Sequence, residues 1–468
     1  MNEAVELAKV QATTQSAQAP QVAEVHALSH EGRGIASVDG KTVFIEGALP
    51  NETVTFSVYK RHRRYNEAKV LEVLKPSKDR VEPACPHFSQ CGGCSLQHMD
   101  AKAQIEFKQN VVLEQCRHFG GVEPLEILPP LLGPVFGYRR RARLGVKYVA
   151  KKNGVLVGFR EKNGRFLADL NQCETLHPSV GRVIPDLKKL IMGMDAYLTI
   201  AQIEVAVGDS VTALVFRHLE PLCESDKKAL FDFGQHFNIH IYLQAKGPDT
   251  ILRLYPEELA AGGLTPEGRN GDQTPRLSYT LPEFNVQIPF QPADFTQVNA
   301  DINVKMVKHA IELLQIEKTD SILDLFCGLG NFSLPMARTC EQVIGIEGSV
   351  EMVQRAKQNA TVNAIKNAEF YAHDLLLPPE VSPQNLDWTK IPFTKVLLDP
   401  PRSGALAVVP WVAELNVSRI VYVSCNPATL ARDVGEWVKH HGFRFEAVGV
   451  MDMFPQTTHV ESIAVLSR

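Results

Sequence analysis

The carboxy-terminal part of the chain repeats one pattern, in which a short apolar run is followed by a stretch with helical spacing. The runs are SILDLF (321–326), QVIGIE (342–347), AEFYAHD (368–374), KVLLDPP (395–401) and RIVYVSC (419–425). Strands that alternate with helices form βαβ units, and continuous apolar runs indicate parallel strands buried on both faces. The last two runs, FRFEAVGVMDMF (443–454) and THVESIAVLS (458–467), leave no room for a helix between them, so we expect an antiparallel hairpin there.

The first run ends in a glycine-containing turn that predicts a cofactor site. Gly328 and Gly330 let the backbone turn tightly, and Glu347, at the end of the next run, is placed to accept hydrogen bonds from ribose hydroxyls. A dinucleotide fingerprint needs a third glycine where this chain has Ser333, and Asp324 would repel a pyrophosphate. S-adenosyl-L-methionine has no phosphate, and its cationic groups suit carboxylates. With its hairpin ending, this α/β region resembles the class I S-adenosylmethionine-dependent methyltransferase (Rossmann-like) fold.

Acidic residues follow two of the later runs. Asp374 ends the third run, where methyltransferases of this class usually hold the adenine, and Asp399 ends the fourth. Asp399 opens an Asp-Pro-Pro sequence that resembles the motif of amino-group methyltransferases, in which an aromatic residue follows and stacks on the target base. This chain has Arg402 at that position. Methylation of an amino nitrogen is therefore the less favoured interpretation.

Cys425 and Glu461 are the candidate nucleophile and base. Cys425 follows the fifth strand, at the sheet edge where ligands bind in open α/β folds, although a cysteine there is often only a small buried apolar residue. C5 of uracil is too poor a nucleophile to take a methyl group directly. A thiolate that adds to C6 makes C5 enolate-like, and a base must later remove the C5 proton. Glu461 starts the last strand and can be that base or an exposed strand carboxylate.

The amino-terminal region contains a tail and a small β-rich module. Residues 1–20 are rich in Ala, Gln, Thr and Ser and predict a flexible tail. Residues 21–78 predict about five short strands in a barrel that resembles a TRAM domain, an OB-like RNA-binding module. Within it, YKRHRRY (59–65) offers cations for phosphates and tyrosines for stacking on bases, or is only a solvated loop. Because the chain has a net charge of −4, any basic surface must be local, as in this run. A second basic run contains Arg139, Arg140, Arg141 and Arg143.

Three of the nine cysteines, Cys85, Cys91 and Cys94, form a C-x5-C-x2-C cluster. The sequence has no secretory leader and no apolar run long enough to span a bilayer, which predicts a cytoplasmic protein. Clustered cysteines in a reducing compartment more often bind metal than form disulfides. Cys173 can supply a fourth thiolate, and four thiolates suit either zinc or an iron–sulfur cluster. His87 or His98 are possible substitutes in a zinc site.

Several motifs of the chain resemble those of the bacterial uracil-C5 RNA methyltransferase family. They are FTQVNADIN (295–303), DLFCGLGNF (324–332), IEGS (346–349), LDPPRSG (398–404), VSCNPATLARD (423–433) and TTHVES (457–462). Together with the cysteine cluster, the TRAM-like start is most similar to the members that make 5-methyluridine in 23S ribosomal RNA. Some members have Ala for the second Pro of DPPRSG.

The resemblance implies a role for particular residues. The methyl donor S-adenosyl-L-methionine would be contacted by Gln297, Phe326, Asn331, Glu347, Asp374 and Asp399. Cys425 would be the nucleophile and Glu461 the proton acceptor. Similar proteins hold a [4Fe–4S] cluster with this cysteine spacing, so Cys85, Cys91, Cys94 and Cys173 would be its ligands. The spacing differs from the C-x3-C-x2-C of radical enzymes.

These observations predict three domains after the tail. Residues 21–78 form the TRAM-like barrel, 79–285 a central β-rich iron–sulfur domain, and 286–468 the methyltransferase domain. Residues 97–120 predict an amphipathic helix that ends at a glycine and packs on the catalytic domain, and 260–275 predict a loop. The expected substrate is 23S ribosomal RNA, and no membrane and no obligate protein partner is implied. The alternatives are C5-methylation of a transfer-RNA uridine or an RNA cytosine, and a non-catalytic iron–sulfur RNA-binding protein.

Overall fold

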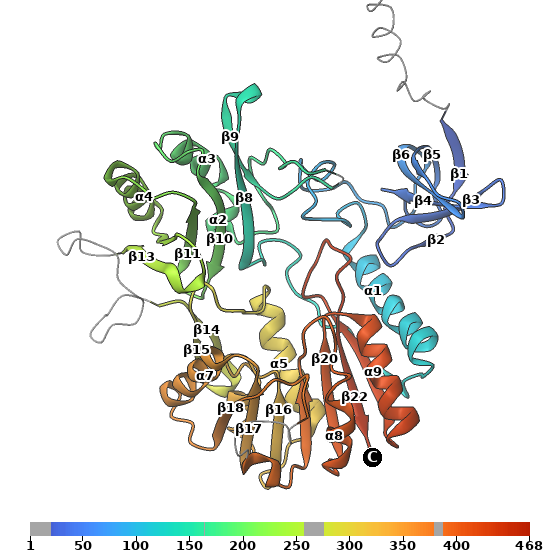
Figure 1. The fold of residues 1–468 in the computed structure, drawn as a ribbon. Coiled ribbons are helices and arrows are strands. Elements are labelled where there is room, and N and C mark those ends of the chain that lie inside the picture. The colour runs from blue at the N-terminus through green and yellow to red at the C-terminus, as the bar shows by residue number, and fades with distance from the viewer. Residues whose placement is uncertain (1–19, 163, 257–275, 379–386) are drawn as a thin grey trace, which may run out of the picture. The chain divides into compact units, whose positions relative to one another are not determined.

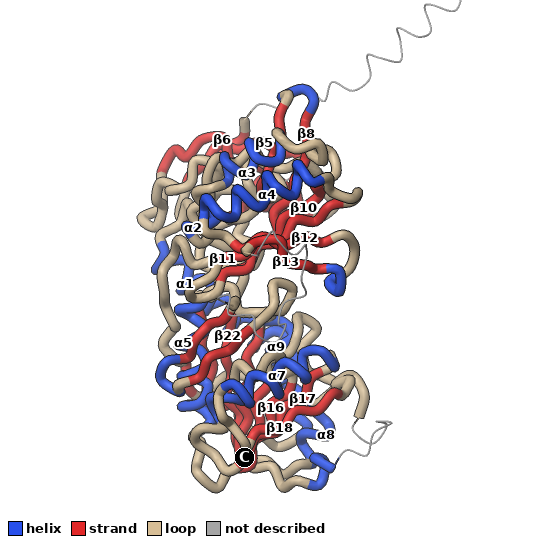
Figure 2. Tube along the Cα trace, turned by 90° about the vertical axis from the view of Figure 1, so that its left-hand side faces the viewer, coloured by secondary structure: helices blue, strands red, loops and turns tan. Residues whose placement is uncertain are grey.

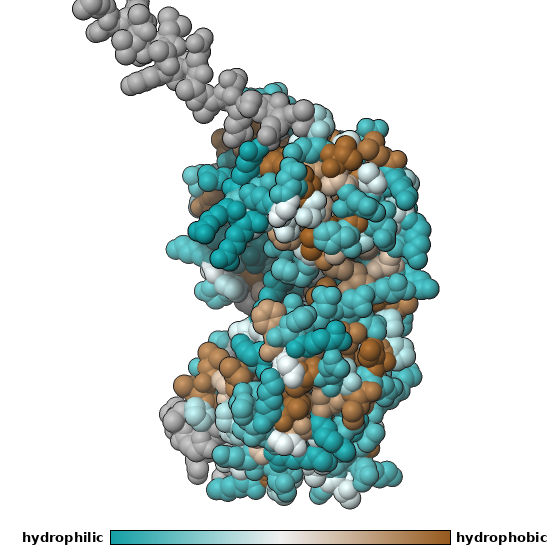
Figure 3. All heavy atoms as spheres, turned by 90° about the vertical axis from the view of Figure 1, so that its right-hand side faces the viewer, coloured by the Kyte–Doolittle hydropathy of each residue, from teal (hydrophilic) through white to brown (hydrophobic). Residues whose placement is uncertain are grey.

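The computed structural model describes residues 20–162, 164–256, 276–378 and 387–468. The predicted tail, apart from its last residue, and the predicted loop 260–275 lie outside the described residues. The chain divides into two compact units, one of residues 1–83 and 96–103 and the other of residues 84–95 and 104–468. The predicted domain limits stay predictions. None of the described helices is long and apolar enough to cross a membrane, and the face drawn in Figure 3 mixes hydrophilic and hydrophobic side chains.

The first unit contains one six-stranded sheet in the order β1-β5-β6-β4-β3-β2. Its strands are β1 (Gln21–Glu24), β2 (Ala27–Leu28), β3 (Gly34–Val38), β4 (Lys41–Glu46), β5 (Thr53–Arg61) and β6 (Tyr65–Lys75). Alternate residues of β4 and β5, such as Val43, Ile45 and Phe56, form its core. The sequence predicted about five strands here, and the structure adds the two-residue β2.

The second unit begins with a six-stranded sheet in the order β13-β12-β11-β10-β8-β9. Its strands are β8 (Arg141–Val149), β9 (Gly154–Gly158), β10 (Ile200–Val207), β11 (Thr212–His218), β12 (His240–Gln244) and β13 (Ile251–Tyr255). The helices α2 (Pro178–Gly181), α3 (Ile184–Met192) and α4 (Glu224–Phe237) belong to the same region. Leu187 of α3 and Leu230 of α4 join the strands in one core, so this region is a sheet with packed helices.

The carboxy-terminal sheet has eight strands in the order β18-β17-β16-β19-β20-β22-β21-β7. They are β7 (Glu126–Ile127), β16 (Ser321–Leu325), β17 (Gln342–Glu347), β18 (Ala368–Ala372), β19 (Lys395–Leu398), β20 (Arg419–Ser424), β21 (Arg444–Met451) and β22 (Glu461–Ser467). β22 runs antiparallel to both β20 and β21, so the predicted hairpin is confirmed. β22 lies between β20 and β21 in the strand order, and Figure 1 shows it beside β20. Glu461 is therefore the first residue of an internal strand.

Helices cover both faces of this sheet (Figure 2), as the continuous apolar runs predicted. Core residues of α5 (Ala300–Leu314), α6 (Ser333–Met336) and α7 (Val350–Val362) pack with one set of alternating strand residues. Core residues of α1 (Ala101–Gln115), α8 (Val409–Glu414) and α9 (Pro427–His440) pack with the other set. The hairpin β14 (Ser278–Leu281) and β15 (Val286–Pro289) forms a separate two-stranded sheet.

The helix predicted at 97–120 begins later and ends differently. α1 begins at Ala101, and its last turn, Cys116–Gly120, is a π-helix. Gly121, not Gly120, takes the left-handed conformation that ends the helix, with φ of +61°. The buried residues of α1 include Gln104 and Lys108, so the buried face is not purely apolar as an amphipathic helix would require.

Candidate functional site

The turn after β16 folds back over the end of β17. Phe326, Gly328 and Gly330 all have positive φ, and a Cβ on Gly330 would lie 2.9 Å from Leu334 Cγ. The Gly328 amide donates a 3.2 Å hydrogen bond to one oxygen of Glu347, and the Ser349 amide donates a 3.1 Å bond to the other. The turn at Gly328 therefore brings a backbone N–H group to the carboxylate that was predicted to contact a ribose.

A cavity of about 1410 Å³ opens at the carboxyl ends of the parallel strands. It is lined by every residue that the sequence proposed for the methyl donor and for catalysis: Gln297, Phe326, Asn331, Glu347, Asp374, Asp399, Cys425 and Glu461. These side chains come from segments far apart in the sequence. They meet because parallel strands end at one edge of the sheet, while the antiparallel β22 begins at that edge.

Asp324 and Asp399, two aspartates near the turn, have different surroundings. Burial raises the pKa of Asp399 to about 7, and its Oδ2 lies 3.4 Å from the side-chain amide nitrogen of Gln297. Asp324 does not line the cavity, although the sequence placed it as a candidate neighbour of a cationic ligand. It is fully buried and accepts a hydrogen bond from the Ser333 hydroxyl, and burial raises its pKa to about 7 despite that bond. Ser333, the residue that departs from the dinucleotide fingerprint, thus stabilises the turn by its hydrogen bond to the buried Asp324.

Glu461 lies close enough to Cys425 to influence the ionisation of its thiol. Burial, and then the Glu461 and Asp399 carboxylates, raise the pKa of the Cys425 thiol to about 11, whereas Arg402 acts in the opposite direction. Burial, and then Asp399, raise the pKa of Glu461 well above its usual range. Glu461 is only 3% exposed, so it is not the exposed strand carboxylate that the sequence left as an alternative. The cavity thus contains several acids that lack a fully compensating cation.

α9 begins directly beyond Cys425, the candidate nucleophile. Asn426 caps this helix by accepting a 3.2 Å hydrogen bond from the Ala428 amide. Because the positive end of a helix dipole stabilises a thiolate, this placement partly opposes the effect of the carboxylates on Cys425. The other cysteines of this domain are worse placed. Cys327 lines the cavity but is buried, with a pKa raised well above the usual value, and Cys340 does not line it.

Some residues of the site carry no signal in the sequence. Tyr279 of β14 donates a 2.9 Å hydrogen bond to Asn331, whose amide also exchanges two hydrogen bonds with Asn303. These bonds fix the orientation of Asn331 at the cavity wall. Phe454, from the segment between β21 and β22, also lines the cavity. No motif marks Tyr279 or Phe454, because each reaches the site only through the packing of distant elements.

The four cysteines predicted as metal ligands lie in one region of the second unit. The thiol of Cys91 interacts electrostatically with those of Cys173, Cys94 and Cys85, and burial together with these neighbours raises its pKa to about 11. The Cys91 amide donates to the His87 carbonyl, and Cys91 pairs with Glu161 as an isolated β-bridge. The structure therefore brings together three cysteines close in sequence with one from a distant loop.

His87 is a poorer candidate ligand than the cysteines. Its Nε2 accepts a 3.1 Å hydrogen bond from the Asn171 amide, so this nitrogen supports the loop that leads to Cys173. His98 belongs to the other compact unit.

The arginines of the run at 139–143 have partners within the protein, although the Arg143 side chain is 70% exposed, and the RNA-binding patch stays a prediction. Arg140 donates a 2.6 Å hydrogen bond to Asp209, and Arg141 donates a 2.6 Å bond to the Pro292 carbonyl. Arg139 lies over the Phe159 ring, and Arg143 is 3.2 Å from Glu204. The sequence could not reveal these partners, because they come from other strands and loops.

The basic run in the first unit forms the tip of the β5–β6 hairpin. His62 stacks on Tyr65, and its ring nitrogen lies 2.7 Å from Glu67. Arg63 and Arg64 are exposed at the tip. The run therefore exposes the side chains of Arg63 and Arg64 at the hairpin tip, where the Glu67 carboxylate holds His62 in place.

Two protein-family models match the chain. The model described as tRNA (Uracil-5-)-methyltransferase matches residues 283–468, and the TRAM domain model matches residues 21–71. Among solved structures, the Pyrococcus abyssi tRNA (uracil-54, C5)-methyltransferase in complex with S-adenosyl-L-homocysteine is similar, with a TM-score of 0.69 and 23% identity. The match covers 95% of this chain and 99% of that one. It shows that the fold is that of a class I methyltransferase with additional domains.

Curated relatives match nearly the whole chain. The 23S rRNA (uracil(1939)-C(5))-methyltransferase RlmD of Nitrosococcus oceani is 52% identical, over 96% of this chain and 97% of the relative. The protein of the same name from Alcanivorax borkumensis is 50% identical, also over 96% and 97%. At this identity and coverage, the chain belongs to the RlmD family of 23S rRNA (uracil-C(5))-methyltransferases.

Proposed function

We propose that this protein transfers a methyl group from S-adenosyl-L-methionine to C5 of a uridine in 23S ribosomal RNA, giving 5-methyluridine. The target is the uridine numbered 1939 in the names of the curated relatives. The observation that carries the proposal is the meeting of Cys425 and Glu461 in one cavity, beside the turn formed by Phe326 and Gly328. Ribosomal RNA as substrate also agrees with action in the cytoplasm.

The geometry supports separate roles for the two groups. The Cys425 thiolate adds to C6 of uracil, and the resulting electron-rich C5 takes the methyl group. Glu461 then accepts the proton from C5, the C5–C6 double bond re-forms, and the thiolate leaves with its electron pair. Both residues line the same cavity, as this sequence of steps requires, since the thiol and the base act on neighbouring carbons of one ring.

The cavity has the chemistry to hold the methyl donor. S-adenosyl-L-methionine supplies an electrophilic methyl group on a cationic sulfur when it is bound. Asp399, whose pKa burial raises to about 7, would gain from a nearby cation, and Glu347 and Asp374 offer carboxylate oxygens for hydroxyl and amino groups. A cationic ligand would also favour the Cys425 thiolate, because it offsets the negative charges that raise the thiol pKa.

The four cysteines, we further propose, hold a [4Fe–4S] cluster in the central domain. A tetrahedral zinc site brings thiolate sulfurs to within roughly 4 Å of each other, as its Zn–S bonds of about 2.3 Å require. In the described part of the chain, the one group of three candidate ligand atoms within 4.8 Å of one another is Asp195, Cys223 and Asp226. The four cysteine thiols are not among the groups of described residues compact enough for a single ion, and four soft thiolates suit a multi-iron cluster. In this proposal the cluster ties distant loops together.

Trapping of the covalent intermediate tests the enzymatic proposal. Glu461→Gln is nearly isosteric and should slow elimination by about 10²–10⁴-fold, so a denaturant-resistant protein–RNA adduct accumulates when the methyl donor is present. Cys425→Ala should give neither adduct nor product, and the double variant should behave like Cys425→Ala. RNA with 5-fluorouridine at the target should trap the wild type. Substantial activity in Cys425→Ala would refute the assigned nucleophile.

Identification of the methylated position tests the substrate. Mass-spectrometric mapping of 5-methyluridine in total RNA should reveal the loss of one site in 23S ribosomal RNA when the gene is deleted. Restoration should require Cys425. Loss of the modification from transfer RNA, or of a methylated cytosine, would instead support one of the alternative substrates.

A further inference from the structure

The segment between β21 and β22, here called the 452–460 loop, leads directly into the proposed base. It begins at Asp452 after β21 and ends at Val460, and Glu461 is the next residue. Asp452, Gln456 and Thr457 are buried, although loops of this kind usually lie on the surface. The loop also contributes Phe454 to the cavity wall. Its conformation therefore bears on both the shape of the cavity and the position of the base.

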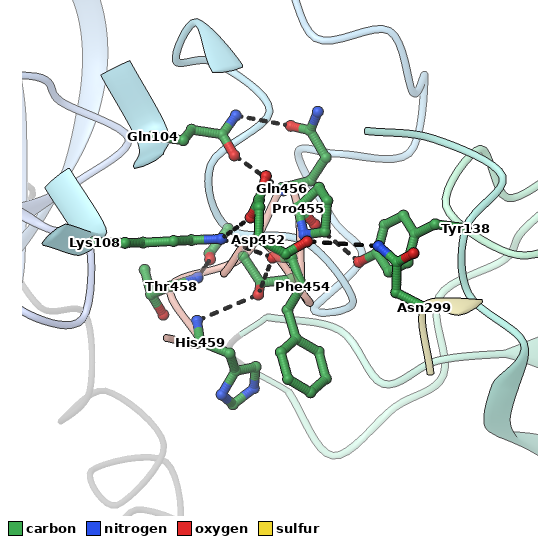
Figure 4. Close-up of polar contacts among 12 residues, drawn as sticks. Gln104, Lys108, Tyr138, Asn299, Asp452, Phe454, Pro455, Gln456, Thr458 and His459 are labelled. Atoms are coloured by element: carbon green, nitrogen blue, oxygen red, sulfur yellow. Dashed lines mark hydrogen bonds and ion pairs between the residues drawn. The ribbon is translucent and has the colours of Figure 1, made fainter. Parts of the chain in front are cut away.

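The backbone of this loop is strained at Gln456, which has φ of +68°. A residue other than glycine in this region costs free energy, so surrounding contacts must hold it there. The Gln104 side chain holds Gln456 through two reciprocal hydrogen bonds. The backbone N–H of Gln456 donates to Gln104 Oε1 at 2.9 Å, and Gln104 Nε2 donates to Gln456 Oε1 at 3.0 Å. Figure 4 shows the two glutamines facing each other.

One turn further along α1, Lys108 holds the beginning of the same loop. Its Nζ donates to Asp452 Oδ1 at 2.6 Å and to the Phe454 carbonyl at 2.9 Å. Lys108 is 0% exposed and Asp452 is 3% exposed, so water screens this pair little. Burying a charged lysine costs free energy unless the charge is paired. Lys108 pairs its charge with Asp452 and the Phe454 carbonyl, both in the 452–460 loop.

Other groups complete the attachment of the loop. The Tyr138 hydroxyl donates to the Pro455 carbonyl at 2.9 Å (Figure 4). The Ser95 amide donates to the Gln456 carbonyl at 2.9 Å, and the Ser95 hydroxyl accepts from the Thr458 amide at 3.0 Å. Ser95 directly follows Cys94, so the cysteine segment contacts the loop as well.

We propose that Gln104 and Lys108 are positioning residues for Glu461, which act by fixing the 452–460 loop. This inference rests on the proposed role of Glu461 as the base. The two residues do not line the cavity, so they act through the loop and not on the substrate. Because the base acts only after methyl transfer, a displaced loop slows elimination more than it slows the earlier steps.

The test compares variants that loosen the loop with a matched control. Gln104→Leu removes the reciprocal pair, and Lys108→Met removes the charge at similar length. The control Lys395→Met breaks another buried lysine–aspartate pair, with Asp320, at the opposite end of the sheet. Each variant is mixed with methyl donor and a ribosomal RNA fragment in a single turnover, and adduct and released product are measured separately. Thermal unfolding and methyl-donor affinity are measured alongside.

We expect Gln104→Leu and Lys108→Met to accumulate the denaturant-resistant adduct, with elimination slowed by roughly 10²-fold, as small misplacements of a catalytic group can do. Methyl-donor affinity should change much less than the elimination rate, although Phe454 of the loop lines the cavity. Lys395→Met should lose stability without accumulating adduct. If both α1 variants lose activity without excess adduct, or if the control accumulates as much, the positioning role is refuted. If Lys108→Met does not fold, Gln104→Leu decides alone.

A second measurement separates this inference from the assignment of the base. Backbone amides of residues 453–461 should exchange with deuterium faster in Gln104→Leu than in the wild type or in Lys395→Met. Unchanged exchange would refute the positioning role even if Glu461→Gln traps the adduct. Absence of an adduct in Glu461→Gln, with faster loop exchange in Gln104→Leu, would refute only the role of Glu461.

Discussion

Glu461 and Cys425 line the same cavity, and the carboxylate opposes ionisation of the thiol. Burial is the largest cause, and with the Glu461 and Asp399 carboxylates it raises the pKa of Cys425 to about 11. In the free protein at neutral pH, Cys425, the proposed nucleophile, is therefore mostly in the unreactive thiol form. Binding of a cation beside these groups would favour the thiolate, which couples activation of the nucleophile to occupation of the cavity.

The thiol titration can be measured directly. Replacing Glu461 by Gln removes a negative neighbour, so the pKa of Cys425 should fall from about 11. The pH profile of Cys425 alkylation, followed by mass spectrometry of the labelled peptide, reports this shift. S-adenosyl-L-homocysteine, which lacks the sulfonium charge, should shift the profile less than a cationic analogue does. An unchanged or raised pKa in Glu461→Gln would contradict the electrostatic coupling.

The metal content distinguishes the two possible uses of the four cysteines. Anaerobically purified protein should be brown and contain about four iron and four sulfide per chain, as a [4Fe–4S] cluster requires. Cys94→Ala should lose the iron and lower the stability of the second unit. His87→Ala serves as the matched control and should keep the iron, because His87 accepts a hydrogen bond from the Asn171 amide. Colourless protein with a single zinc ion would refute the cluster.

The two basic runs should respond differently to mutation. Arg63→Ala with Arg64→Ala should weaken RNA binding and reduce the slope of log affinity against log salt by about 0.7–0.9 for each phosphate that the protein no longer neutralises. Arg141→Ala should instead lower the free energy of unfolding by roughly 1–3 kcal/mol, because a buried carbonyl loses its partner. Anisotropy titrations at several salt concentrations and thermal unfolding measure both effects. If Arg141→Ala instead reduces the slope of log affinity against log salt and leaves stability unchanged, the run at 139–143 is an RNA-binding surface.

Glu52 predicts a pH dependence of stability in the first unit. Burial alone would raise its pKa, but the Arg80 guanidinium and the Leu49 and Ser77 amides outweigh burial and hold the pKa below 4.5. A depressed carboxyl pKa stabilises the fold above the unfolded pKa and loses that contribution as the pH falls through the folded value. Glu52→Gln should therefore unfold at a lower temperature than the wild type at pH 7. That difference should shrink below about pH 4.5, and a constant difference would contradict the prediction.

Much of the catalytic domain could be predicted from local patterns. Apolar runs, the Gly328–Gly330 turn and the closing hairpin specify strands, their connections and one edge of a sheet, since these depend on spacing along the chain. The motifs around Cys425 and Glu461 likewise predicted residues that the structure brings into one cavity. The first unit was predicted to similar depth, because its alternation of side chains is also local.

The partners of several polar side chains were decided by packing between distant segments and could not be predicted. Arg141 was expected to meet RNA but donates to the Pro292 carbonyl, and Asp324 was expected near a ligand but bonds to Ser333. Gln104 and Lys108 belong to a helix that was predicted to bury an apolar face, yet they hold the 452–460 loop. A charged side chain has the same local sequence signal whether it meets solvent, RNA or a buried partner. Its partner depends on which segments the folded chain brings together, and spacing along the sequence carries no information on that.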